Sequence, residues 1–123
     1  MDASATAAIR EMAKDFIRCL HRVAPDFERA FFRFKLEPAA YGSNASYVSG
    51  AAILLLDPFE NSAFFETANE RARSLLHNFC KTQGVALLTV DAAFDYKIDF
   101  DWNDLDRWKI TKVDGASGIP AGL

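Results

Sequence analysis

Residues 62–90, SAFFETANERARSLLHNFCKTQGVALLTV, decide the fold, because a helical pattern changes to a strand pattern at one glycine. Apolar side chains recur at steps of three and four residues, which predicts a helix with one core-facing stripe over 62–83. We expect Gly84 to follow this helix in the left-handed conformation that glycine adopts freely. The apolar run 85–90 then predicts a strand.

The chain before this unit predicts another helix and two strands. Residues 4–24 carry an amphipathic helical stripe that Pro25 ends. Residues 27–36 alternate between apolar and charged side chains, as a half-buried strand does. A turn at 41–44 and a further strand over 45–56 complete a predicted hairpin.

Two features of the 45–56 segment bear on the sheet. Gly50 predicts a bulge or bend within the strand. The end, Ile53 to Leu56, is apolar on both faces, which indicates a central position. Because a helix joins this segment to the strand at 85–90, we expect the two strands to be parallel neighbours with a right-handed crossover.

The last strand is expected at 94–102, where aromatic and aliphatic side chains alternate with charged ones. Residues 1–113 are therefore expected to form a single α+β domain, and the Gly- and Ala-rich residues 114–123 a flexible tail. The order helix, hairpin, helix, hairpin predicts a four-stranded sheet with two helices packed on one face and the other face open.

Composition narrows the class of protein. The 123 residues are 50% hydrophobic and 25% charged, with 11 Phe and a net charge of -3, which suits one globular domain and argues against general nucleic-acid binding. The N-terminus is charged where a secretory signal is apolar, and the run 51–56 is too short to span a membrane. We expect a cytoplasmic protein without membrane or nucleic-acid partners. Cys19 and Cys80 lie on the two helical stripes and are predicted to be buried reduced thiols.

The densest polar signal is a run of aspartates near the C-terminus. A calcium loop starting at Asp99 would need Gly at position 104 and Glu at 110, where the chain has Asp104 and Ile110, so no metal site is predicted. Two interpretations remain open for these acids. They form either a solvated strand face or an acidic patch for a basic protein partner.

No catalytic motif is recognisable. The sequence lacks a phosphate-binding Gly-rich loop, a nucleophile elbow, and metal-binding or redox Cys and His patterns. His21 and His77 lie two and three residues from the cysteines, but neighbours along a helix seldom form a nucleophile and base pair. The sequence predicts a protein that is not an enzyme, with no catalytic residues and no cofactor.

The stretch 88–105, LTVDAAFDYKIDFDWNDL, resembles the C-terminal hairpin of the YezG-like immunity proteins, and Asn103 stands where that pattern has an acid. The matching residues are Tyr96, Lys97, Ile98, Asp99, Phe100, Asp101, Trp102, Asp104 and Leu105. The resemblance implies an antitoxin that binds a cognate toxin domain, often a nuclease, and covers its active site.

Charge and exposure suggest which residues bind such a partner. The hypothesis names Asp95, Asp99, Asp101, Asp104, Asp106 and Trp108. An alternative function is that of a type III secretion-type chaperone, which would bind an extended effector segment as a homodimer. The sequence leaves the oligomeric state open.

Overall fold

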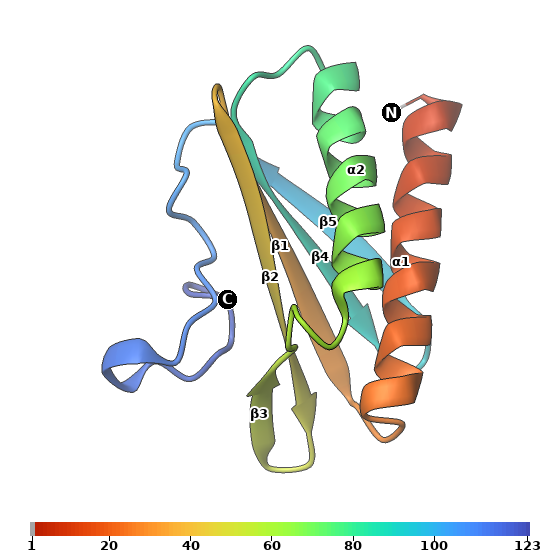
Figure 1. The fold of residues 1–123 in the computed structure, drawn as a ribbon, viewed down its shortest axis with the longest axis vertical. Helices are drawn as coiled ribbons and strands as arrows, with labels where there is room; N and C mark the ends of the chain where they lie inside the picture. The colour runs from red at the N-terminus through yellow and green to blue at the C-terminus, as the bar shows by residue number, and fades with distance from the viewer. Residues whose placement is uncertain (1) are drawn as a thin grey trace.

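The computed structural model describes residues 2–123, in which two helices cover one face of a five-stranded antiparallel sheet (Figure 1). The strand order across the sheet is β3-β2-β1-β4-β5. The elements in chain order are α1 (Ala3–Val23), β1 (Arg29–Glu37), β2 (Ala40–Ser49), β3 (Ala52–Leu55), α2 (Ser62–Asn78), β4 (Gly84–Asp91), β5 (Tyr96–Asp101) and a 3-10 turn, η1 (Val113–Gly115). The α+β class with two helices is as predicted, whereas the expected four strands are five.

Helix α1 forms where the apolar periodicity placed it. The side chain of Asp2 accepts a hydrogen bond from the backbone N–H of Ala5 at 2.7 Å, which caps the first turn. The predicted stripe is buried at Ile9, Met12, Phe16 and Leu20. Neither helix in residues 2–123 has the length and apolarity that a membrane crossing requires.

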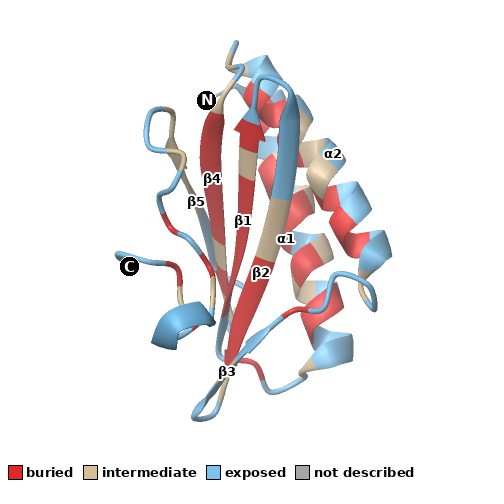
Figure 2. Cartoon of the chain, turned by 60° about the vertical axis from the view of Figure 1, so that its left-hand side comes forward, coloured by how far each residue is buried: buried red, intermediate tan, exposed pale blue. Residues whose placement is uncertain are grey.

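The main core lies between the helices and the sheet. Phe16 of α1 stacks on Phe64 of α2 with ring centroids 5.2 Å apart, and both rings pack edge-on against Phe32 of β1. Burying one such ring stabilises the fold by about 1.5–3 kcal/mol. Figure 2 shows that the buried residues of the sheet gather in β1, β4 and the C-terminal half of β2, while β3 and β5 are more exposed. Phenylalanine therefore supplies much of the contact that fixes the helix layer on the sheet.

The predicted parallel neighbours were wrong. Strands β2 and β4 both pair antiparallel with β1, so β1 lies between them. Strand β1 is buried along nearly its whole length, and the β1–β2 hairpin leaves its other edge open. Pairing with β4 satisfies the backbone groups of that edge, which would otherwise be buried without partners.

The segment predicted as one strand over 45–56 is a hairpin. Gly50 adopts φ 61° in the turn that separates β2 from β3, so it reverses the chain instead of forming a bulge. Strand β2 begins at Ala40, which places the expected turn at 41–44 inside a strand. The apolar β3 lies at the edge of the sheet and not at its centre, contrary to the prediction.

Helix α2 ends at Asn78, five residues earlier than predicted. The N–H of Lys81 donates to the carbonyl of Leu76 at 3.1 Å, and that of Cys80 donates to His77 at 2.9 Å. This is the Schellman arrangement, and its left-handed residue is Cys80 with φ 59°. The residue expected in that role, Gly84, instead opens β4.

The sheet face that was expected to be open is partly covered. Beyond β5 the chain crosses this face on the side opposite to the helices (Figure 1). We call residues 105–120 the C-terminal strap. Its apolar side chains join Phe31, Val48, Val85 and Leu87 in a second cluster. Residues 114–123, expected to be a flexible tail, include two buried residues, Gly118 and Pro120, and Ile119 packs against this cluster.

Candidate functional site

Strand β5 presents different chemistry on its two faces. Lys97, Asp99 and Asp101 lie opposite Thr89, Leu87 and Val85 of β4, on the face of the second cluster. The alternate residues of β5 face the helices, where Ile98 and Phe100 pack against the main core. The predicted alternation of this strand is therefore confirmed, and two of the proposed binding acids share one face.

Asp101 organises the turn that follows β5. One carboxylate oxygen, Oδ1, accepts the backbone N–H groups of Asn103 at 3.0 Å and Asp104 at 2.9 Å. The other, Oδ2, pairs with Arg107 at 3.0 Å. The two backbone donors, first Asp104 and then Asn103, together with the Arg107 guanidinium, lower the pKa of Asp101 to about 2. This carboxylate is consequently held by its own chain, which leaves it less free to contact a partner.

Of the remaining acids of the hypothesis, Asp95 lies in the β4–β5 turn, Asp99 on β5, and Asp104 and Asp106 in the turn after it. Asp99 pairs with Lys97 and Asp106 with Lys109, each at 3.5 Å, and Asp104 accepts the N–H of Asp106 at 3.0 Å. Residues 95–112 contain five aspartates and four lysines or arginines. Their charges nearly cancel, so long-range attraction of a basic partner by this segment is weak.

Trp108, the aromatic member of the hypothesis, is only 5% exposed. Its ring belongs to the second cluster, and the Arg107 guanidinium lies 4.4 Å from the ring centroid. Trp108 therefore holds the C-terminal strap against the sheet and offers little surface to a partner.

Arg33 is a residue whose role the sequence did not reveal. Its Nε donates to the carbonyl of Arg107 and its terminal nitrogen to that of Leu105, both at 2.8 Å, and the residue is 8% exposed. Burial lowers the pKa of this guanidinium, while the charges of Asp106 and Asp104 act to raise it. The alternation of β1 assigned Arg33 to the correct face but gave no sign that a strap covers that face.

The β4–β5 turn displays aromatic side chains. The carboxylate of Asp91 accepts the N–H groups of Ala93 at 2.9 Å and Asp95 at 3.1 Å, which fixes the turn. Phe94 adopts φ 67° and is 56% exposed, and Tyr96 is 41% exposed. A bulky residue in the left-handed region costs on the order of 1 kcal/mol or more relative to an ordinary conformation. Hydrogen bonds of the turn thus hold an aromatic ring in solvent at an energetic cost.

A groove runs between this turn and α1. It has a volume of about 430 Å³ and a mostly apolar lining. Ala13, Ile17, His21, Phe94 and Tyr96 form its apolar and aromatic part, and Arg10, Lys14 and Arg18 its basic rim. The rings of His21 and Phe94 meet edge to face at 5.5 Å. Sequence analysis missed this groove, because nothing in the two separate patterns showed that α1 and the turn are adjacent.

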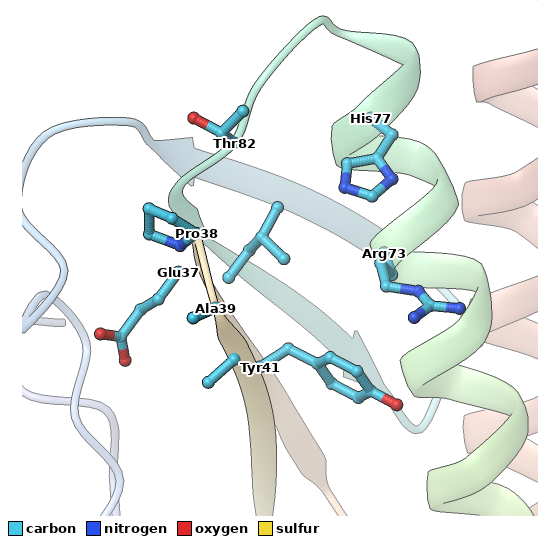
Figure 3. A pocket seen from close by; sticks show the side chains of 9 residues that line it. Glu37, Pro38, Ala39, Tyr41, Arg73, His77 and Thr82 are labelled. Atoms are coloured by element: carbon cyan, nitrogen blue, oxygen red, sulfur yellow. The ribbon is translucent and has the colours of Figure 1, made fainter.

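A second cavity, of about 440 Å³, opens between the β1–β2 turn and the C-terminal half of α2 (Figure 3). Arg73 there is engaged, since its guanidinium pairs with Glu70 at 3.3 Å and lies 5.3 Å from the ring centroid of Tyr41. Figure 3 shows the Glu37 carboxylate pointing away from His77. The cavity therefore does not bring this acid and this imidazole together.

The cysteines and other metal-ligating groups are dispersed. Within residues 2–123, no three or more His, Cys, Asp or Glu side chains are grouped so as to hold a metal ion. Cys19 is buried as predicted, its Sγ donates to Asn61 at 3.4 Å, and burial raises its pKa while Arg22 acts to lower it. Cys80 was expected to be a buried thiol on a helical stripe, and this prediction is wrong. Helix α2 ends at Asn78, so Cys80 lies beyond the helix and is exposed.

Comparison of the sequence with models of protein families and with curated proteins gives no match.

Proposed function

We propose that this protein is an immunity protein that binds and neutralises a toxin domain, and that it binds through the β4–β5 turn and the groove beside it. The observation that carries the proposal is the exposed side chain of Phe94, whose backbone is left-handed in a turn fixed by hydrogen bonds from Ala93 and Asp95 N–H to the Asp91 carboxylate. Backbone strain of this kind clusters at functional sites, and a glycine at this position would remove it. The ring meets His21 at 5.5 Å, yet the residue stays 56% exposed, which leaves much of its apolar surface available to a partner.

The chemistry of this surface suits a protein partner. Exposed aromatic side chains are the residues that most often anchor protein interfaces, and a rim of charged groups around them is typical. Phe94 and Tyr96 provide the anchors, and Asp95 lies between them. The groove next to them can accept an apolar side chain of the partner. A projecting turn of this kind can enter a concave active site, which is how we propose the toxin is blocked.

One further observation supports the antitoxin role, and a second bears on where its interface lies. The sequence that resembles the immunity proteins, residues 88–105, covers the second half of β4, the β4–β5 turn, β5 and the turn after it. Of the acids named in the original hypothesis, Asp99, Asp101 and Asp106 already have basic partners within 3.5 Å. We therefore move the centre of the proposed interface from the acids after β5 to Asp95 and the two aromatic residues beside it.

The experiment begins with tagged protein used to capture partners from a lysate of the source organism, followed by sizing of the complex. We expect one folded toxin domain, bound at one copy per copy of this chain. The wild-type protein, co-expressed with that domain, should restore growth. Unfolded secretion substrates bound to a homodimer would instead establish the chaperone alternative.

Phe94→Gly locates the interface. Glycine accepts φ 67° without strain, so the variant should be about as stable as the wild type, within roughly 1 kcal/mol. Its affinity for the toxin domain should fall at least about tenfold, because a central aromatic anchor is lost. Val113→Gly, which removes another exposed apolar side chain (69% exposed), is the matched control. Unchanged affinity and unchanged growth rescue by the Phe94 variant would place the interface elsewhere.

A further inference from the structure

The outer edge of β3 lacks a partner strand. β3 is the last strand of the sheet, and within residues 2–123 its backbone pairs only with β2. The β2–β3 hairpin extends past the N-terminal end of α2, away from both helices (Figure 1). The outward N–H and C=O groups of an unpaired edge can accept another strand, which gives β3 the chemistry of a strand-addition site.

The two edges of the sheet differ in charge. The β5 edge carries Lys97, Asp99 and Asp101, which is the protection that natural edge strands ordinarily have against unwanted pairing. Residues 50–56, GAAILLL, contain no charged residue and no proline. Only the β5 edge is therefore protected by its side chains, and β3 is left open to association.

The side chains around β3 are apolar and solvent-exposed. Leu54 is 41% exposed and Leu55 is 47% exposed, and consecutive strand residues point to opposite faces of the sheet. Phe59, four residues beyond the strand, is 91% exposed. Solvent-exposed apolar groups on both faces of an open edge indicate a contact surface for another polypeptide.

From these observations we infer that β3 pairs antiparallel with β3 of a second copy of this chain, which joins two five-stranded sheets into one continuous sheet. A second copy is the occupant that fits, because an uncharged apolar strand is complementary to itself and carries no charge to select a different partner. The inference does not depend on the proposed function, since the β4–β5 turn belongs to the opposite edge and remains free in the dimer.

Symmetry restricts the register of this pairing. Directly opposed residues in a sheet point to the same face, so a two-fold antiparallel pair must be centred on a residue and not between two residues. Centring on Leu54 places it opposite its own copy and Ile53 opposite Leu55, which brings the three large apolar residues of β3 into contact across the axis. Asp57 then lies opposite Ala51, so no like charges meet.

The test is sedimentation equilibrium of the full chain over a wide concentration range. A strand of four residues makes a small interface, so we expect a reversible dimer with a dissociation constant on the order of micromolar to hundreds of micromolar. Leu54→Lys should raise that constant at least about tenfold, because it opposes two charges across the axis. Val113→Lys, another exposed apolar residue changed to lysine, should leave the constant unchanged.

Cross-linking gives an independent readout of the register. In a Cys80→Ser background, Leu54→Cys should form an intermolecular disulfide under mild oxidation, whereas Val113→Cys should not. A wild-type chain that stays monomeric throughout the concentration range would overturn the inference. So would a Leu54→Lys variant that is folded by circular dichroism and dimerises like the wild type. Dimer formation without toxin binding would support this inference and count against the proposed function. Toxin binding by a chain that stays monomeric would support the proposed function and overturn this inference.

Discussion

Replacing Arg33 with methionine tests whether the guanidinium holds the C-terminal strap on the sheet. The side chain donates two hydrogen bonds of 2.8 Å to backbone carbonyls of the strap, at Leu105 and Arg107. Methionine retains most of the apolar stem of arginine but has no donor. Both carbonyls would then lose their partner beside a nearly buried site.

The expected loss of stability in Arg33→Met follows from these two hydrogen bonds. Hydrogen bonds from a charged donor contribute about 1.5–3 kcal/mol each to stability. Removing the guanidinium also removes the cost of burying its charge, so we take the low end and expect a loss of about 3 kcal/mol. With a urea dependence of about 1.5 kcal/mol per molar for a domain of this size, the unfolding midpoint should fall by about 2 M.

The assay is urea unfolding followed by tryptophan fluorescence. A loosened strap exposes Trp108, so the Arg33→Met variant should also emit at longer wavelength before it unfolds. Lys35→Met is the matched control, because Lys35 is on the same strand and face and pairs with Glu37 at 3.5 Å near the surface. The Lys35→Met variant should lose less than about 1 kcal/mol of stability. An Arg33→Met variant within about 1 kcal/mol of the wild type, with unchanged emission, would show that apolar packing alone holds the strap.

Three further predictions concern the strap and the end of β5. Asn44→Ala removes the 2.7 Å hydrogen bond from Nδ2 to the carbonyl of Ile110 and should lower the free energy of unfolding, measured with urea, by about 1–2 kcal/mol. An unchanged free energy of unfolding would mean that water replaces the amide. The pKa of Asp101 is about 2 in the folded chain and about 3.9 in an unfolded one, so its contribution is present above pH 4 and is lost as the pH falls towards 2. Asp101→Asn should therefore flatten the fall in urea midpoint between pH 4 and pH 2, and an unchanged slope would contradict this assignment. Gly84→Ala places a Cβ 2.6 Å from Cε3 of Trp102. The variant should lose about 1–3 kcal/mol of stability and change the near-UV circular dichroism spectrum. Wild-type stability would mean that the indole moves freely.

Local patterns in the sequence predicted the elements whose boundaries depend on nearby residues. The stripe from Ile9 to Leu20 predicted α1, because helix periodicity acts within a few residues. Alternation likewise located β1 and β5. The same reasoning failed at β3, because an apolar run indicates burial but does not show whether a strand pairs with it on both sides.

The candidate site was predicted only in part. The sequence singled out the β5 region and its acids, but the ion pairs of Asp99 and Asp106 with lysines of the same segment became visible only in three dimensions. Trp108 was expected to be available to a partner and is buried. The groove could not be anticipated, since Ile17 and Phe94, which line it together, are far apart in the chain.

The sequence by itself determined the α+β class, the two helices and the alternating faces of β1 and β5, because hydrophobic periodicity and capping are local properties of the chain. The tertiary structure decided the order of the strands, the edge position of β3 and the burial of Arg33. Each of these depends on which distant segment covers a given face, and that is set by the competition among apolar faces and unpaired backbone groups across the whole chain.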